Sequence, residues 1–106
     1  MSEMTIEREA KILEGAVGRY GALAQVVVAI EECSELQKAL TKWMRSAMAS
    51  EHGDFSLSGE HLADNIREEM ADVGIMLNQL ALIFGDANEE EIAKLERLER
   101  RLQEHE

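Results

Sequence analysis

Apolar side chains recur every three or four positions along most of this chain, which is the period of an amphipathic helix. The pattern predicts four helices, over residues 5–20, 22–48, 60–84 and 88–103. Gly21 separates the first two helices and Gly85 ends the third, since glycine readily adopts the backbone conformation that closes a helix. Asn88 followed by Glu91 is typical of a helix start. We therefore expect an all-α fold.

The second predicted helix carries more apolar surface than one neighbouring helix can cover. Its apolar residues lie on several sides of the helix: Leu23, Val26, Val27, Ile30, Leu36, Leu40, Trp43, Met44 and Ala47. The chain has 106 residues, which suits one domain over residues 1–106 with a small core. The sequence therefore predicts a bundle of these helices that assembles as an oligomer.

Composition narrows the classes of protein to which this chain can belong. The absence of proline and a hydrophobic content of 45% favour helices throughout. The formal net charge of −11 argues against broad affinity for nucleic acid or anionic membranes, because both require a basic surface. No stretch reaches the roughly 18 apolar residues of a membrane span, and the first residues lack the order of a secretory signal. With Cys33 as its single cysteine, we expect a soluble, cytoplasmic protein.

Two acidic clusters lie within the predicted helices, one around Glu32 and Glu35 and the other around Glu69 and Asp72. Helical rotation places each of these pairs within an apolar stripe, and the position four residues later never holds Lys or Arg. Carboxylates in such positions need a cation or protonation. Their hard oxygen ligands suit Mg²⁺ or Mn²⁺. We therefore expect a divalent metal site, with an ordinary solvated acidic face as the alternative.

In order and setting, Glu31-Glu32-x-x-Glu35 and Glu69-x-x-Asp72 resemble the paired motifs of the MazG-like all-α nucleoside triphosphate pyrophosphatase superfamily. The resemblance covers about residues 20–103. It implies a four-helix module that assembles as a homodimer or homotetramer. It also implies a Mg²⁺-dependent enzyme that hydrolyses a nucleoside triphosphate to a monophosphate and pyrophosphate. By position, Glu32 and Glu35 correspond to the first metal-binding pair, Glu69 and Asp72 correspond to the second, and Glu31 matches the leading acid.

The substrate of such an enzyme would carry about four negative charges, which divalent ions and basic side chains must offset. Glu31 and Glu35 are the candidates to accept the proton of the attacking water. Lys42 lies seven positions after Glu35 and is either a phosphate ligand or an ordinary surface lysine. Further candidates for the phosphates come from the last helix, where they could instead form intrahelical salt bridges: Lys94, Arg97 and Arg101.

Aromatic residues that could stack on a base are few. Trp43 lies close to the direction of Glu32 on the same predicted helix, so it either faces the base or belongs to the core. Phe55, in the polar loop over residues 49–59, either covers a nucleotide or docks on the bundle.

Two other functions remain open at this point. The resemblance also allows hydrolysis of phosphoribosyl-ATP, a second activity within the same superfamily, for which the bulkier ribosylated adenine would need a differently lined base pocket. Alternatively, the chain is a non-catalytic helical assembly or regulatory module in which the acids form a structural metal site. The predicted primary role is nucleotide pyrophosphate hydrolysis, in the clearance of non-standard or excess nucleotides.

Overall fold

The computed structural model describes residues 3–49 and 59–104, and all the regular structure in these residues is helical. Four helices follow one another: α1 (Ile6–Tyr20), α2 (Ala22–Ala49), α3 (Gly59–Phe84) and α4 (Asn88–Glu104). The expected all-α class is therefore confirmed. Each predicted helix is present, and its bounds differ from the prediction by one residue at most.

A sharp corner joins α1 to α2. Thr5 caps the start of α1, where its Oγ1 accepts a hydrogen bond of 3.0 Å from the backbone N–H of Arg8. Gly21 ends α1 with φ +88 and ψ 153, a combination that is essentially restricted to glycine. Within the described residues no single helix is long and apolar enough to cross a membrane; α1 and α2 meet that test only as a pair bent by 111°.

Residues 85–87 connect α3 to α4. Gly85 follows α3 with φ +95, as expected for a glycine that ends a helix. Asn88 is the first residue of α4 rather than the capping residue before it. Asp86 Oδ1 accepts a hydrogen bond of 3.1 Å from the backbone N–H of Asn88, so Asp86 supplies the polar side chain at this helix start.

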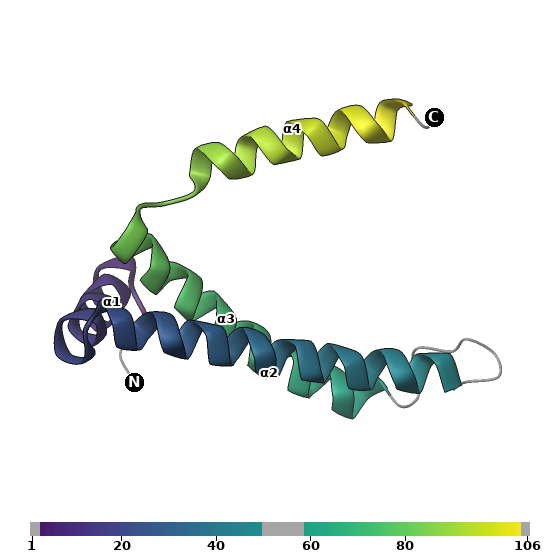
Figure 1. Ribbon diagram of the computed structural model, residues 1–106, viewed down its shortest axis with the longest axis horizontal. Helices are drawn as coiled ribbons and strands as arrows, with labels where there is room; N and C mark the ends of the chain where they lie inside the picture. The colour runs from purple at the N-terminus through teal and green to yellow at the C-terminus, as the bar shows by residue number, and fades with distance from the viewer. Residues whose placement is uncertain (1–2, 50–58, 105–106) are drawn as a thin grey trace.

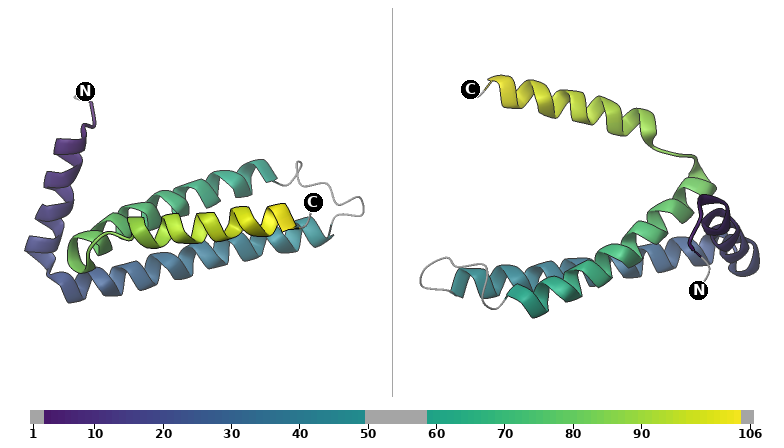
Figure 2. Two further views of the ribbon diagram at one scale, coloured as in Figure 1. Left: turned by 90° about the horizontal axis from the view of Figure 1, so that it is seen from above. Right: turned by 180° about the vertical axis from the view of Figure 1, so that it is seen from behind.

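The helices α2 and α3 form an antiparallel pair, and α1 packs across one end of it (Figures 1 and 2). Asn78 Nδ2 of α3 donates a 3.2 Å hydrogen bond to Glu9 Oε1 of α1. Mainly small side chains fill the contact, which lets the helix axes approach closely. The buried apolar residues of the described chain are Leu13, Ala29, Ala39, Ala47 and Met76.

By contrast, α4 packs against none of the other described helices, and each of its residues is exposed. Figure 1 shows it as the yellow-green arm that leaves the end of α3 and runs back above the α2–α3 pair. The radius of gyration is 17.8 Å, against about 13 Å for a compact chain of this length. A single chain therefore packs three helices and projects the fourth.

Candidate metal centre

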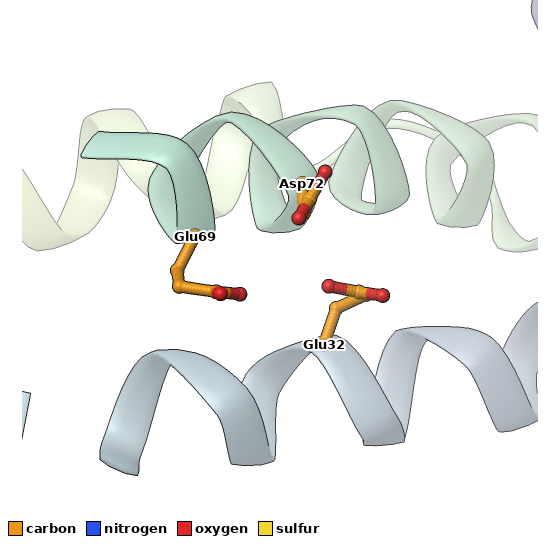
Figure 3. Close-up of side chains that lie close together, drawn as sticks. All are labelled: Glu32, Glu69 and Asp72. Carbon is orange, nitrogen blue, oxygen red and sulfur yellow. The ribbon is translucent and has the colours of Figure 1, made fainter. Parts of the chain in front are cut away.

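Three carboxylates from two helices meet between α2 and α3. Glu32 extends from α2, and Glu69 and Asp72 extend toward it from α3 (Figure 3). One oxygen atom from each of the three side chains lies within 4.8 Å of the others. Glu69 and Asp72 share a face because they stand three positions apart on a helix. We call Glu32, Glu69 and Asp72 the carboxylate cluster.

The carboxylate cluster lies at the edge of the helix contact. Glu32 and Glu69 are half-buried, whereas Asp72 is exposed. Partial burial raises the pKa of Glu32 above its ordinary value, and the neighbouring charges of Asp72 and Glu69, with a hydrogen bond to Asp72, raise it further. Among the described Lys and Arg side chains, none forms an ion pair with these three acids. The cluster therefore concentrates negative charge that a cation would relieve.

Glu35 and Glu31 lie outside the carboxylate cluster. Glu35 is exposed and stands outside the carboxylate cluster, and its Oε1 forms a 3.2 Å ion pair with Lys38 Nζ. It still lies near enough to contribute to the raised pKa of Glu32. Glu31 is exposed and lies about 100° around α2 from Glu32. The structure thus brings together three of the four predicted metal ligands, and it places Glu35 beside them.

An open groove of about 510 Å³ adjoins the carboxylate cluster along α2. Acidic, basic and amide side chains all contribute to its lining, which includes Glu35, Lys38, Lys42, Arg45, Asn65 and Glu69. We call it the mixed-charge groove. Lys42 was a predicted substrate ligand, and the groove adds Lys38, Arg45 and Asn65. The two additional bases were detectable in the sequence, because residues 38, 42 and 45 follow the i, i+4, i+7 spacing of one helix face.

The remaining predicted substrate residues lie away from the carboxylate cluster. Trp43 is half-buried, about 16 Å along α2 from Glu32 on the side that faces α3, and it does not line the groove. Three bases project from α4, which contacts no other described helix: Lys94, Arg97 and Arg101. A single chain therefore does not bring them to the carboxylates. Phe55 and the rest of residues 50–58 lie outside the described residues.

Comparisons of the chain with protein-family models, curated proteins and solved structures found no match. The resemblance to the MazG-like superfamily therefore rests on the two acidic motifs and their helical setting, and it stays a prediction. The chemical interpretation of the site depends on its own geometry.

That geometry fits a hard divalent cation. Three carboxylates provide the charged oxygen donors that Mg²⁺ and Mn²⁺ prefer, and an exposed member such as Asp72 leaves room for water or substrate oxygens. The donor set contains no thiolate or imidazole, which would favour softer metals. The arrangement can therefore hold a metal ion at the end of a groove that also offers positive charge to an anion.

Proposed function

We propose that this protein is a Mg²⁺-dependent nucleoside triphosphate pyrophosphohydrolase that releases a nucleoside monophosphate and pyrophosphate. One observation carries the proposal. Glu32, Glu69 and Asp72 converge from two helices next to a groove lined by Lys38 and Lys42. A cation site beside lysines suits a ligand that is itself anionic, which the net charge of −11 would otherwise repel.

The carboxylate cluster is the proposed metal site. Glu32, Glu69 and Asp72 would hold Mg²⁺, with Mn²⁺ as a substitute of similar preference for oxygen donors. A bound ion would polarise a phosphoryl oxygen and lower the pKa of a coordinated water. Partial burial and the neighbouring carboxylates of Asp72, Glu69 and Glu35 disfavour the ionised form of Glu32, and a bound cation would offset this cost.

The bases of the mixed-charge groove are the proposed ligands of the phosphate chain. Lys38, Lys42 and Arg45 lie on one face of α2 and line the groove beyond Glu35. Their charge-assisted hydrogen bonds would hold the β- and γ-phosphates and position the α-phosphorus near the carboxylate cluster. The Glu35–Lys38 ion pair is exposed, so exchanging it for a phosphate contact costs little.

Glu35 is the proposed general base. It lines the groove, whereas Glu31 does not, so the geometry favours Glu35 of the two predicted candidates. As the water oxygen bonds to the α-phosphorus, Glu35 accepts the water proton and the bond from the α-phosphorus to the bridging oxygen breaks. Pyrophosphate then leaves. The acting unit is proposed to be a cytoplasmic homo-oligomer that removes unwanted nucleotides.

The test is pyrophosphate release from a panel of canonical, deoxy and modified triphosphates together with phosphoribosyl-ATP, with Mg²⁺ or Mn²⁺. We expect release from at least one triphosphate, and complete loss of release with chelator. Turnover of phosphoribosyl-ATP alone would transfer the proposal to that substrate. Thermal stabilisation by Mg²⁺ without turnover of any compound would contradict an enzymatic role and indicate a metal-binding assembly module.

A further inference from the structure

The proposed reaction defines the direction in which a substrate lies on the α2–α3 pair. Lys38 and Lys42 follow Glu32 along α2, so the mixed-charge groove extends from the carboxylate cluster toward the C-terminal end of α2. Helix α1 crosses the opposite end of the pair, where α2 begins (Figures 1 and 2). With the β- and γ-phosphates in the groove and the α-phosphorus at the cluster, the sugar and base of the substrate are directed toward α1.

A row of side chains on α3 leads from the carboxylate cluster to α1. Asp72, Ile75 and Asn78 follow one another at three-residue steps, so they are neighbours on the helix surface and span about 9 Å along its axis. Asp72 belongs to the cluster, and Ile75 is 50% exposed. At the far end, Asn78 Nδ2 donates a 3.2 Å hydrogen bond to Glu9 Oε1 of α1. The sugar and base of one nucleotide extend over a comparable length.

Glu9 and Asn78 form a polar pair that two helices hold in place, and we call it the amide–carboxylate pair. Both side chains are exposed. Because the amide turns its nitrogen toward the carboxylate, Asn78 Nδ2 keeps a second N–H for another partner, and Glu9 keeps Oε2 and a further lone pair on Oε1. From one end to the other, the pair therefore presents one donor and then two acceptors: Asn78 N–H, Glu9 Oε1 and Glu9 Oε2.

The Watson–Crick edge of guanine has the complementary order. It presents the O6 acceptor, then the N1–H donor, then the 2-amino donor. Adenine and cytosine place a single amino group beside a ring nitrogen that accepts, and uracil places a single N–H between two carbonyl oxygens. Guanine is thus the one common base with two adjacent donors, which a carboxylate can accept together in charge-assisted hydrogen bonds.

We propose that the substrate is a guanine nucleoside triphosphate whose base is recognised by Glu9 and Asn78 at the contact between α1 and α3. Asn78 donates to O6, Glu9 accepts from N1–H and the 2-amino group, and the exposed side chain of Ile75 contacts the face of the ring. This assignment rests on the proposed function, because the position of the phosphate chain sets the direction of the base.

The first test uses the wild-type protein and three purine triphosphates, with kcat/KM for pyrophosphate release as the readout. We expect ITP, which lacks the 2-amino group, to be at least about 10-fold poorer than GTP. XTP should be at least about 100-fold poorer, because its 2-carbonyl oxygen faces the carboxylate of Glu9. Equal values for the three, or a preference for ATP, CTP or UTP, would overturn the guanine assignment and leave the hydrolase proposal intact. Absence of release from every triphosphate would contradict both.

A change of specificity tests the role of Glu9 directly. In Glu9→Gln, the amide oxygen can still accept from Asn78, but an N–H donor replaces Oε2, so the order becomes donor, acceptor, donor. That order matches xanthine. We expect the ratio of kcat/KM for GTP to that for XTP to fall at least about 100-fold, with XTP becoming the better substrate.

Glu7→Gln is the matched control for this change. Glu7 is an exposed glutamate two positions before Glu9, about 160° around α1 from it. The control should keep the wild-type preference for GTP, and thermal melts should show that both variants fold. An unchanged ratio in Glu9→Gln, or the same shift in Glu7→Gln, would contradict recognition of the base by Glu9.

Ile75→Ala tests the position of the ring without changing the polar pattern. Because the contact is with the face of the base, we expect KM to rise about 10-fold for both GTP and ITP, while kcat and the ratio between the two substrates stay nearly constant. An unchanged KM would contradict the placement of the base between the carboxylate cluster and α1.

Discussion

The two apolar sides of α2 differ in the size of their residues. The apolar side chains that are fully buried against α3 are small, such as Ala29 and Ala39, and this side also includes the half-buried Glu32 and Trp43. A second apolar side lies about 100° around α2, and we call it the outer face. It carries large apolar side chains, such as Leu23 and Met44, in contact with solvent. In a helix of a monomeric soluble protein, the large apolar side chains normally face the core and not the solvent. The two sides of α2 therefore differ in what they do: one packs on α3 and carries Glu32, and the other exposes large apolar residues.

Small residues on the inner side serve the carboxylate cluster. Alanine lets two helix axes approach closely, and carboxylates from both helices can then reach one another. This arrangement buries little apolar area, because Leu13 and Met76 are the only large apolar side chains in the described core. Burial of the outer face would supply the missing apolar area at about 25 cal/mol per Å². The contact between α2 and α3 thus brings the carboxylates together, and most of the large apolar side chains of α2 remain outside that contact.

The largest expected effect comes from removal of one ligand of the carboxylate cluster. We predict that Glu69→Gln lowers pyrophosphate release at least about 100-fold, because the carboxylate cluster loses one of three charged oxygen donors. The helical circular dichroism signal should remain. Glu68→Gln, an exposed neighbour outside the cluster, is the control and should retain activity. Full activity of Glu69→Gln would remove Glu69 from the metal site.

A second pair of variants inverts the size difference between the two sides of α2. Ala39 packs against α3 and is 4% exposed. The larger side chain of Ala39→Leu would overfill this contact, so it should lower the free energy of unfolding by about 1–3 kcal/mol and weaken stabilisation by Mg²⁺. Leu40→Ala, one residue further and on the outer face, should leave the stabilisation by Mg²⁺ unchanged, because Leu40 is 44% exposed and lies outside the α3 contact. Chemical denaturation with and without Mg²⁺ measures both. Interchanged results would show that the two sides had been assigned wrongly.

The pH dependence of the metal-free protein provides a third test. Because the pKa of Glu32 is raised in the folded state, folding binds protons, and the free energy of unfolding falls as pH rises from about 4.5 through the folded pKa. In metal-free buffer, Glu32→Gln should therefore melt at a higher temperature than the wild type at pH 7, and the gap should close toward pH 4. Glu31→Gln controls for the loss of one exposed charge. A gap that widens on acidification would contradict this assignment.

The smallest expected effect concerns Gln79. It is 3% exposed in α3, and its Oε1 accepts no hydrogen bond from the described chain. We predict that Gln79→Met raises stability by about 1 kcal/mol, because the unsatisfied polar atom is removed at similar volume. Mg²⁺ binding should be unchanged, since Gln79 lies outside the carboxylate cluster. Thermal melts of both proteins test this, and destabilisation would indicate that Gln79 has an important polar partner.

The sequence was most informative about local structure. Helical periodicity and the glycines at 21 and 85 set all four helices to within a residue, because these signals act over a few neighbouring positions. Spacing alone also grouped Glu69 with Asp72 on one side of a helix. It could not show that Glu35 turns to Lys38 while Glu32 turns to α3, since the choice depends on how two helices cross. For the same reason, it could not show that Lys94 stays away from the site.

Carboxylates from α2 and α3 are proposed to form one cation site, and a direct measurement of Mn²⁺ binding tests this proposal. Electron paramagnetic resonance can titrate Mn²⁺ into the wild type, Asp72→Asn and the control Glu31→Gln, with Mg²⁺ as competitor. We predict saturable, Mg²⁺-competed binding that Asp72→Asn weakens at least about 10-fold and Glu31→Gln leaves intact. Equal affinity in all three proteins, or no saturable binding in the wild type, would contradict the account.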